Sequence, residues 1–269
     1  MMFAQYFGLK ANPFVKEVEN TALFVSKDLR ELYSRLEFMK TTRGFFLLTS
    51  EPGCGKTTVL RKFVDSLNPG LFKICYTPLS SVTVMDFYRG LVLRMGEEPI
   101  YKKVLMFEQL QRLIRTCFHE KKVTPVFILD EAHCLSSSVL DDIQMIFNFK
   151  MDSENPFILI FSGHNIVRAR LHLSIHQSLR QRIAGNYHMA GLARDEVAAY
   201  LSSRLSLAGA PNPDGIFSES ACESIFSHTS GFPRLVNNLA TAALTCAYAK
   251  NQTQIDDELV YQAAKDIEI

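Results

Sequence analysis

Two short groups of residues in this chain have the types and order that phosphate chemistry needs. In the first group, a glycine-containing loop leads directly into Lys56 and Thr57. Gly53 and Gly55 can adopt a positive φ, which points successive backbone N–H groups at one anion. Lys56 supplies a charge for the β- and γ-phosphates, Thr57 supplies a hydroxyl for Mg²⁺, and the helix expected next adds its positive N-terminus. The sequence therefore predicts a loop that binds the phosphates of a nucleotide.

The full loop, residues 50–58, nearly matches the Walker A pattern G-x-x-x-x-G-K-[ST]. Ser50 occupies the first glycine position, which puts the geometry of the turn in question but not the phosphate chemistry. For the loop taken alone, the alternative is a chance Gly-Lys-Thr in an ordinary strand-to-helix turn. The predicted nucleotide-binding residues of the loop are Ser50, Glu51, Pro52, Gly53, Cys54, Gly55, Lys56, Thr57 and Thr58.

The second group is Asp130 and Glu131, which follow the apolar run 126–129. Such a run is typical of a strand buried on both faces of a parallel sheet, and ligands bind beyond the carboxyl ends of these strands. We expect Asp130 to hold Mg²⁺ through its water shell and Glu131 to orient and polarise an attacking water. The alternative is a solvated acidic pair that caps the following helix.

Two further sets of polar residues lie next to predicted strands. Ser162 and His164 follow the apolar run 157–161, and either can contact the γ-phosphate or the attacking water. A single histidine at a strand end is more often a local hydrogen-bonding residue, which is the alternative here. Arg180 and Arg182 precede a short strand, and a guanidinium can neutralise a transferring phosphoryl group, also from a neighbouring subunit. A pair of surface cations is the alternative here.

A parallel sheet with helices around it is needed to bring these motifs together. The hydrophobic patterns predict strands at 45–48, 72–77, 126–129 and 157–161, and a short one after Arg182. They predict helices at 27–42, 57–67, 84–95 and 107–120. From residue 192 onward only helices are predicted, at 196–207, after Ser218, from Pro233 to about Lys250, and after Asp256.

We therefore expect an α/β fold with a small all-helical C-terminal domain. Residues 1–191 are predicted to form the nucleotide-binding domain with an N-terminal arm, and residues 192–269 the helical lid. The aromatic residues between positions 6 and 14 fit either a packed arm or a role beside the nucleotide base.

Composition narrows the class of protein. The chain has 269 residues, of which 47% are hydrophobic, so a sizeable core is expected. With a net charge of +1, the protein as a whole does not attract nucleic acid electrostatically, so any basic surface must be local. The six cysteines have no paired spacing, the first residues do not read as a signal peptide, and no run approaches the ~18 apolar residues of a membrane span. We expect a cytoplasmic protein with reduced thiols and no membrane contact.

In their order along the chain, these motifs resemble an AAA+ ATPase, most closely the ExeA/GspA group of secretion ATPases and the related MuB- and TnsC-type regulators of DNA transposition. The resemblance covers nearly the full length, and its later parts include the stretch Gly231-Phe-Pro-Arg234. It implies a P-loop AAA+ fold, ATP and Mg²⁺ as cofactors, ATP hydrolysis, and a homo-oligomer that forms a ring or a helical filament.

The resemblance also implies a role for each matching residue. Lys56 and Thr57 match Walker A, Asp130 and Glu131 match Walker B, and His164 lies where a sensor-1 polar residue usually sits. Arg182 is the better match to the trans-acting arginine finger, with Arg180 second, and Arg234 matches sensor 2. Because Arg234 begins a helix, where a cation opposes the dipole, helix stability gives it little reason to be there.

The expected function is that of an ATP-dependent regulator of DNA transposition. This choice depends on the chain ending at Ile269 without a membrane span, and it implies a transposase partner and binding to double-stranded DNA without sequence preference. The candidate DNA contacts are Lys102, Lys103, Lys121 and Lys122, for which a solvated basic face is the alternative. Secretion-complex assembly or other protein remodelling, and an ATP-gated scaffold with little hydrolysis, remain open alternatives. Cys117, His119, His133 and Cys134 lack the spacing of a zinc finger, so we expect no such zinc site.

Overall fold

The structure is a computed structural model that describes residues 2–15, 24–78 and 83–268. The chain divides into two compact units, and each is described here by itself. An α/β unit comprises residues 32–51 and 56–189, and a helical unit comprises residues 1–31, 52–55 and 190–269.

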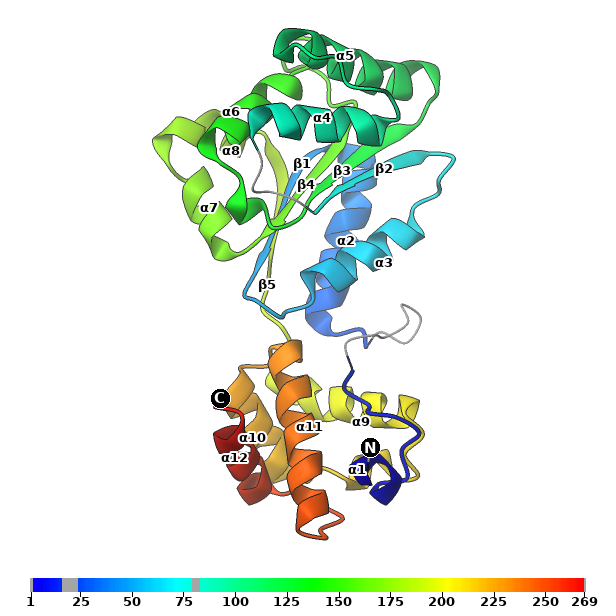
Figure 1. Ribbon diagram of the computed structural model, residues 1–269, viewed down its shortest axis with the longest axis vertical. Helices are drawn as coiled ribbons and strands as arrows, with labels where there is room; N and C mark the ends of the chain where they lie inside the picture. Colours follow the sequence, from blue (N-terminus) through cyan, green and yellow to red (C-terminus); the bar gives the residue numbers. More distant parts are fainter. Residues whose placement is uncertain (1, 16–23, 79–82, 269) are drawn as a thin grey trace. The chain divides into compact units, whose positions relative to one another are not determined.

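The α/β unit is built on a parallel sheet of five strands (Figure 1). The strands are β1 (Gly44–Ser50), β2 (Phe72–Thr77), β3 (Thr124–Leu129), β4 (Ile158–Gly163) and β5 (Ile183–Met189). Their order across the sheet is β2-β3-β4-β1-β5, so β1 is flanked by β4 and β5. The expected parallel α/β fold is therefore confirmed, and all four apolar runs predicted as strands are strands.

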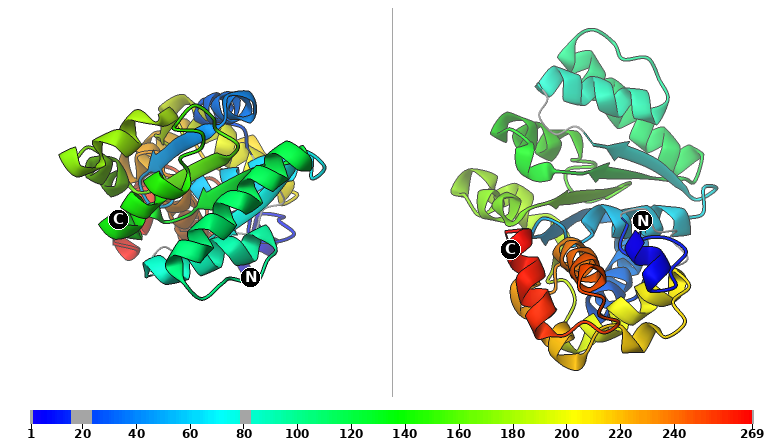
Figure 2. Two further views of the ribbon diagram at one scale, coloured as in Figure 1. Left: turned by 90° about the horizontal axis from the view of Figure 1, so that it is seen from above. Right: turned by 60° about the horizontal axis from the view of Figure 1, so that its bottom comes forward.

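Helices cover both faces of this sheet (Figures 1 and 2). On one face lie α4 (Val84–Met95), α5 (Lys103–Arg115) and α6 (Ser137–Ile146), and on the other lie α2 (Lys27–Thr42) and α3 (Lys56–Ser66). Because side chains alternate along a strand, Phe45 and Leu47 belong to the core cluster under α4 to α6, while Phe46 contacts the opposite side, near Met39 of α2. Two covered faces explain why β1, β3 and β4 are buried at every residue.

The helices of the α/β unit differ in detail from the predictions. Helix α5 begins four residues earlier than expected and ends in a π turn over Thr116–Glu120. Three short helices were not predicted: α6, α7 (Asn165–Leu171) and α8 (Gln177–Gln181). The last two are five to seven residues long, too short to give a clear helical repeat of apolar positions.

The helical unit contains α9 (Val197–Leu207), α10 (Glu219–Thr229), α11 (Pro233–Ala249) and α12 (Asp257–Asp266), with α1 (Met2–Tyr6) packed on α11. Ser218 and Asp256 cap α10 and α12 as expected, each accepting a hydrogen bond from a backbone amide of the first turn. Within the described residues, no helix is long and apolar enough to cross a membrane.

The N-terminal segment belongs to this helical unit. Phe3, Phe7 and Phe14 lie in its core, and the guanidinium of Arg204 donates to the carbonyl of Pro13 at 2.7 Å. The sequence-based division had instead assigned these residues to the nucleotide-binding domain. The N-terminal segment joins the helical unit through contacts between residues about 190 positions apart. A local sequence pattern cannot predict contacts over such a separation.

Candidate functional site

The phosphate loop connects β1 to α3, as predicted. Lys56 is the first residue of α3 and is 7% exposed, and its ammonium group donates to the hydroxyl of Ser50 at 2.8 Å. Gly53 and Gly55 have φ values of 87° and 95°, which only glycine adopts without strain. Ser50 is the last residue of β1 and does not have a positive φ, so a side chain is tolerated where the Walker pattern has glycine. The loop therefore keeps its turn geometry despite this departure.

Asp130 lies at the centre of a hydrogen-bond network beyond the carboxyl end of β3. Its Oδ2 accepts from the hydroxyls of Thr57 and Tyr76, each at 3.1 Å. Its Oδ1 accepts from the hydroxyl of Ser162 at 2.9 Å and from the backbone N–H of Glu131 at 3.1 Å. The carboxylate is 4% exposed, and these donors offset the cost of burying its charge.

This arrangement fits a hard divalent cation. Thr57 and Asp130, which are 73 positions apart in the sequence, present a hydroxyl and a carboxylate within hydrogen-bond distance of each other. Oxygen donors of this kind are the ligands that Mg²⁺ prefers, usually with several retained waters. The donor chemistry predicted for a Mg²⁺ site is therefore present at one edge of the sheet.

Tyr76 is a site residue that the sequence reasoning missed. It is the penultimate residue of β2, and burial, together with the nearby Asp130 carboxylate, raises its pKa to about 12. It therefore remains a protonated donor to Asp130 at neutral pH. Its position near the end of the strand next to β3 was the available signal, because parallel strands end at a common edge.

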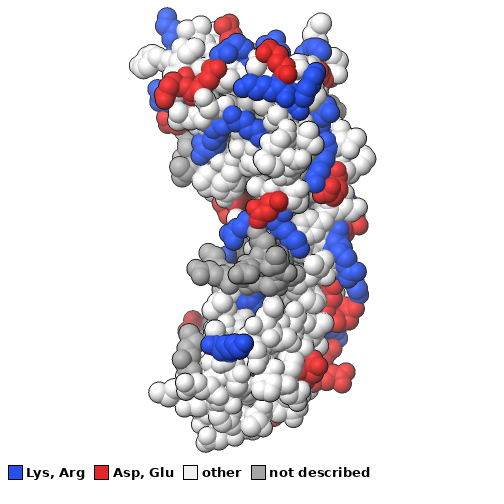
Figure 3. Space-filling model, turned by 90° about the vertical axis from the view of Figure 1, so that its right-hand side faces the viewer, with Lys and Arg blue, Asp and Glu red and all other residues white. Residues whose placement is uncertain are grey.

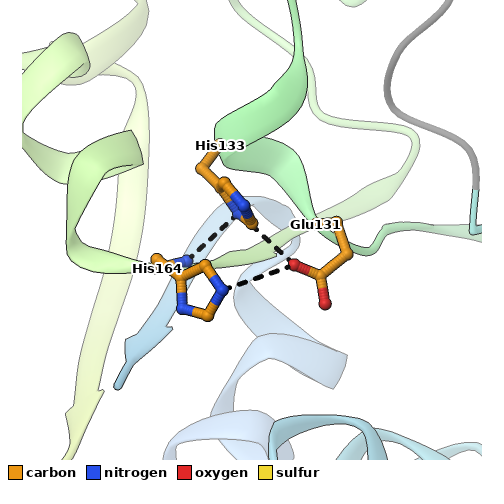
Figure 4. A group of neighbouring side chains, drawn as sticks. All are labelled: Glu131, His133 and His164. Atoms are coloured by element: carbon orange, nitrogen blue, oxygen red, sulfur yellow. Dashed lines mark hydrogen bonds and ion pairs between the residues drawn. The ribbon is translucent and has the colours of Figure 1, made fainter. Parts of the chain in front are cut away.

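Glu131 leaves the strand in an unusual backbone conformation. Its φ of 53° lies in the left-handed region, and its side chain is 50% exposed. The carboxylate lies 3.8 Å from Nε2 of His164 and 3.4 Å from Nδ1 of His133 (Figure 4). His164, predicted as a sensor, thus lies beside Glu131, whereas Ser162, the other candidate at that strand tip, bonds to Asp130.

The two arginines considered for the finger differ sharply. The guanidinium of Arg182 donates to the carbonyls of Gln144 and Phe147 at 2.9 and 2.5 Å, and pairs with Asp152 at 2.7 Å. It also lies 5.0 Å from the ring centroid of Phe45. Burial lowers the pKa of this guanidinium, and Asp152 opposes that shift. These contacts anchor Arg182 to the C-terminal end of α6, whereas Arg180 has an exposed contact with His172 at 3.0 Å.

Arg234, the predicted sensor 2, is the second residue of α11 in the helical unit. The same unit includes residues 52–55 of the phosphate loop, and the Arg234 amide donates to the carbonyl of Gly53 at 3.2 Å. A Cβ on Gly53 would lie 2.8 Å from the Cβ of Arg234, so this approach requires glycine.

The four lysines proposed as DNA contacts lie in two pairs, one at the start of α5 and one after the π turn that ends this helix. All four are exposed, and Lys103 also pairs with the buried carboxylate of Asp142 at 2.8 Å. Figure 3 shows basic and acidic side chains interspersed on the upper part of the face that it draws.

Comparison with known proteins agrees with the fold. Residues 39–171 match the family model of the AAA domain. The chain is 29% identical over 258 residues to general secretion pathway protein A of Aeromonas hydrophila, covering 94% of this chain and 46% of that protein. The chain thus spans less than half the length of this relative.

Solved structures with the same fold include Cdc6p from Pyrobaculum aerophilum, with a TM-score of 0.63 and 17% identity, covering 93% of this chain and 71% of that one. The Thermotoga maritima RuvB Holliday junction branch migration motor has a TM-score of 0.56 and 20% identity, covering 89% and 68%. The Aeropyrum pernix ORC2 protein has a TM-score of 0.64 and 14% identity, covering 96% and 71%. At these identities the likeness concerns the fold alone.

A relation to the MuB- and TnsC-type regulators does not emerge from these comparisons. The domain match, the secretion-protein relative, the parallel sheet and the strand-to-helix loop together support an AAA+ protein that is similar to the ExeA/GspA-like group.

Proposed function

We propose that this protein binds ATP with Mg²⁺ and hydrolyses it, as the ATPase module of an ExeA/GspA-like system. The observation that carries the proposal is the meeting of Thr57 and Asp130 at 3.1 Å, beside the buried Lys56. If the Gly-Lys-Thr turn had arisen by chance, its threonine hydroxyl would not be expected within hydrogen-bond distance of a carboxylate at the end of another strand. The A. pernix ORC2 structure contains ADP and ADPNP, which supports an adenine nucleotide as the ligand of this fold.

Each residue at the strand tips has a distinct task in this proposal. Lys56 leaves its hydrogen bond to Ser50 and binds the β- and γ-phosphates. Thr57 and Asp130 would hold Mg²⁺, and the bound ion would supply positive charge beside the phosphate oxygens. The half-exposed Glu131 orients and polarises the attacking water. Ser162 and Tyr76 keep the Asp130 carboxylate in position through their hydroxyls.

The arginine finger of a neighbouring subunit is best assigned to Arg180. Arg182 would have to leave two carbonyls and Asp152 to reach across an interface. Arg180 would give up only an exposed contact with His172. A trans-acting finger requires a homo-oligomer, so assembly into a ring or filament is part of the proposal. Arg234 is assigned to sensing the nucleotide from the helical unit.

A role in secretion-complex assembly or related protein remodelling is favoured over DNA transposition. The matched relative is a secretion pathway protein, whereas the lysines expected to contact DNA include one that is paired with Asp142. The transposase partner and the DNA contacts predicted from the sequence gain no support from the comparisons, and the cytoplasmic location stays a prediction.

Two substitutions test the ATPase assignment. Lys56→Ala should abolish nucleotide binding, measured with a fluorescent ATP analogue, whereas Lys62→Ala on the same helix should bind normally. Glu131→Gln should retain binding but lose hydrolysis by at least about 100-fold, which follows from removal of a positioned general base. Glu108→Gln on α5 is its matched control. Hydrolysis that persists in Glu131→Gln would refute the role of Glu131, and absence of hydrolysis in the native protein would favour the ATP-gated scaffold.

The choice between protein remodelling and transposition has its own test. Binding of random duplex DNA, measured with ATP across a salt titration, should be absent even at low salt. Retention at low salt with a steep salt dependence would instead support the transposition reading.

A further inference from the structure

Glu131, His133 and His164 form a compact cluster of metal-ligand side chains (Figure 4). One ligand atom from each of the three residues lies within 4.8 Å of the others. The Glu131 carboxylate is 3.4 Å from Nδ1 of His133 and 3.8 Å from Nε2 of His164. The residues come from two segments, since Glu131 and His133 follow β3 and His164 follows β4.

Local backbone features hold these side chains together. The left-handed conformation of Glu131 leads into the 3-10 turn η3 (Ala132–Cys134), which carries His133. The carbonyl of His133 accepts a hydrogen bond from Arg170 at 3.0 Å, which ties this turn to α7. A Cβ on Gly163 would lie 3.3 Å from Nδ1 of His133 and 3.1 Å from its backbone nitrogen. The turn can therefore approach β4 this closely because residue 163 has no side chain.

The chemistry of the cluster differs from that of the Mg²⁺ site. The neutral imidazole of histidine is a common metal ligand. Two imidazoles and one carboxylate suit Zn²⁺ and similar first-row cations, whereas Mg²⁺ prefers oxygen ligands alone.

The two distances from Glu131 are close to those of a tetrahedral site. With Zn–N bonds of about 2.0–2.1 Å, neighbouring ligand atoms of a tetrahedral zinc site lie about 3.3 Å apart. The contacts of 3.4 and 3.8 Å from Glu131 need small rotations of a side chain that is half exposed. Coordination through Nδ1 of His133 would also replace the 3.4 Å hydrogen bond that this atom accepts from the backbone N–H of His164.

We propose that Glu131, His133 and His164 bind Zn²⁺, or a similar borderline divalent cation, and that this metal inhibits ATP hydrolysis. Coordination occupies the Glu131 carboxylate, which is then unable to orient the attacking water. Nucleotide binding is unaffected, since Lys56, Thr57 and Asp130 are not ligands of this metal. The inhibitory effect rests on the proposed ATPase function, whereas metal binding itself does not.

Metal binding can be tested without nucleotide or turnover. Titration of the whole protein with Co²⁺, followed by the visible d–d spectrum, should show one equivalent bound, and Zn²⁺ should displace it. His133→Ala should weaken Co²⁺ binding at least about tenfold, since even changes behind the ligands of a metal typically cost 10–100-fold. His119→Ala is the matched control, because His119 pairs with Glu154 at 3.2 Å outside the cluster. Cys134→Ser tests the exposed thiol beside His133.

The outcomes of this titration are decisive for the site. Co²⁺ binding that is equal in the native protein and in His133→Ala, or that is lost in Cys134→Ser, would overturn the proposed ligand set. Binding that is retained in His119→Ala and Cys134→Ser but lost in His133→Ala supports it. Circular dichroism of each variant establishes that a loss of binding does not reflect unfolding.

Inhibition is measured separately, as hydrolysis of Mg²⁺-ATP at buffered free Zn²⁺ concentrations. Each variant is compared with its own rate without Zn²⁺. The native protein should be inhibited at the concentrations that fill the site, and His133→Ala should need at least about ten times more Zn²⁺. Equal inhibition of both would overturn the regulatory effect even if the metal binds. If the native protein hydrolyses no ATP, the proposed function fails, while the Co²⁺ titration still decides whether the metal site exists.

Discussion

Replacement of Arg182 by methionine should destabilise the α/β unit, because this guanidinium anchors the end of α6. It donates to the carbonyls of Gln144 and Phe147, pairs with the half-exposed Asp152, and lies over Phe45. Methionine keeps most of the apolar stem but removes all of these polar contacts.

The size of the effect follows from these contacts. Hydrogen bonds that involve a charged group contribute about 1.5–3 kcal/mol each, whereas a partly exposed ion pair contributes at most about 1 kcal/mol. The cation–π contact adds about 0.5–1 kcal/mol. Water can reach part of the freed helix end, and the contributions are not additive, so we expect a loss of about 2–4 kcal/mol. With a urea m value of about 3 kcal/mol/M, the unfolding midpoint would fall by about 1 M.

The assay is urea unfolding followed by circular dichroism, combined with ATPase measurements. Arg180→Met is the matched control and should change stability by less than about 0.5 kcal/mol, because its contact with His172 is exposed. Arg180→Met should instead lose ATPase activity, and mixing it with Lys56→Ala subunits should restore part of that activity across a shared interface. If Arg182→Met leaves stability unchanged and abolishes hydrolysis, the structural role of Arg182 is wrong and it is the finger.

Three further predictions concern the loop, the helical unit and the cysteines. Ser50→Gly should change ATP affinity by less than about fivefold, since Ser50 has no positive φ and its hydroxyl contacts Lys56 only until phosphate binds; a complete loss of binding would contradict this. Gly231→Ala should destabilise the helical unit by at least about 2 kcal/mol, because φ is 74° and the added Cβ would lie 2.0 Å from the carbonyl oxygen of Leu192. Gly70→Ala is its control in thermal unfolding, and equal melting temperatures would refute the argument. In timed alkylation at pH 8 with mass spectrometry, the exposed Cys134 should react first and Cys75 last, since burial raises the pKa of Cys75 to about 12 and leaves a thiolate fraction of about 10⁻⁴. Cys54 is only 4% exposed, so it should react slowly even without ATP, and rapid modification would show that the loop opens.

Most of the sheet could be predicted from the sequence. The runs at 45–48, 72–77 and 126–129 are apolar or β-branched over their whole length or nearly so, and all three are strands. The runs of β1 and β3 are informative because these strands are buried at every residue, so neither has a polar side to confuse the pattern. The short helices α7 and α8 were missed, since five to seven residues do not repeat a helical period clearly enough.

Part of the site was also predictable, because its chemistry depends on local order. Two motifs can be recognised from a few consecutive residues each. One is the glycine-containing loop that ends in Gly55-Lys56-Thr57, and the other is the carboxylate pair at the end of a strand. Tyr76 was missed, because its position near the end of a predicted strand was the available signal and many residues without a role in a site share such a position. Its hydroxyl bonds to Asp130 only because β2 and β3 are neighbours in register, with Thr77 beside Leu129.

The sequence by itself thus determined the kind of chemistry, since the residue types around Lys56 and Asp130 specify a phosphate and a hard cation. The tertiary structure decided which of several similar residues takes which position. In the folded chain Ser162 bonds to Asp130, and His164 lies beside Glu131. His133 lies next to His164, and Arg182 is hydrogen-bonded to the end of α6. The physical reason is that hydrogen bonds and ion pairs form between atoms within about 3–4 Å, and which atoms come that close depends on strand order and helix packing.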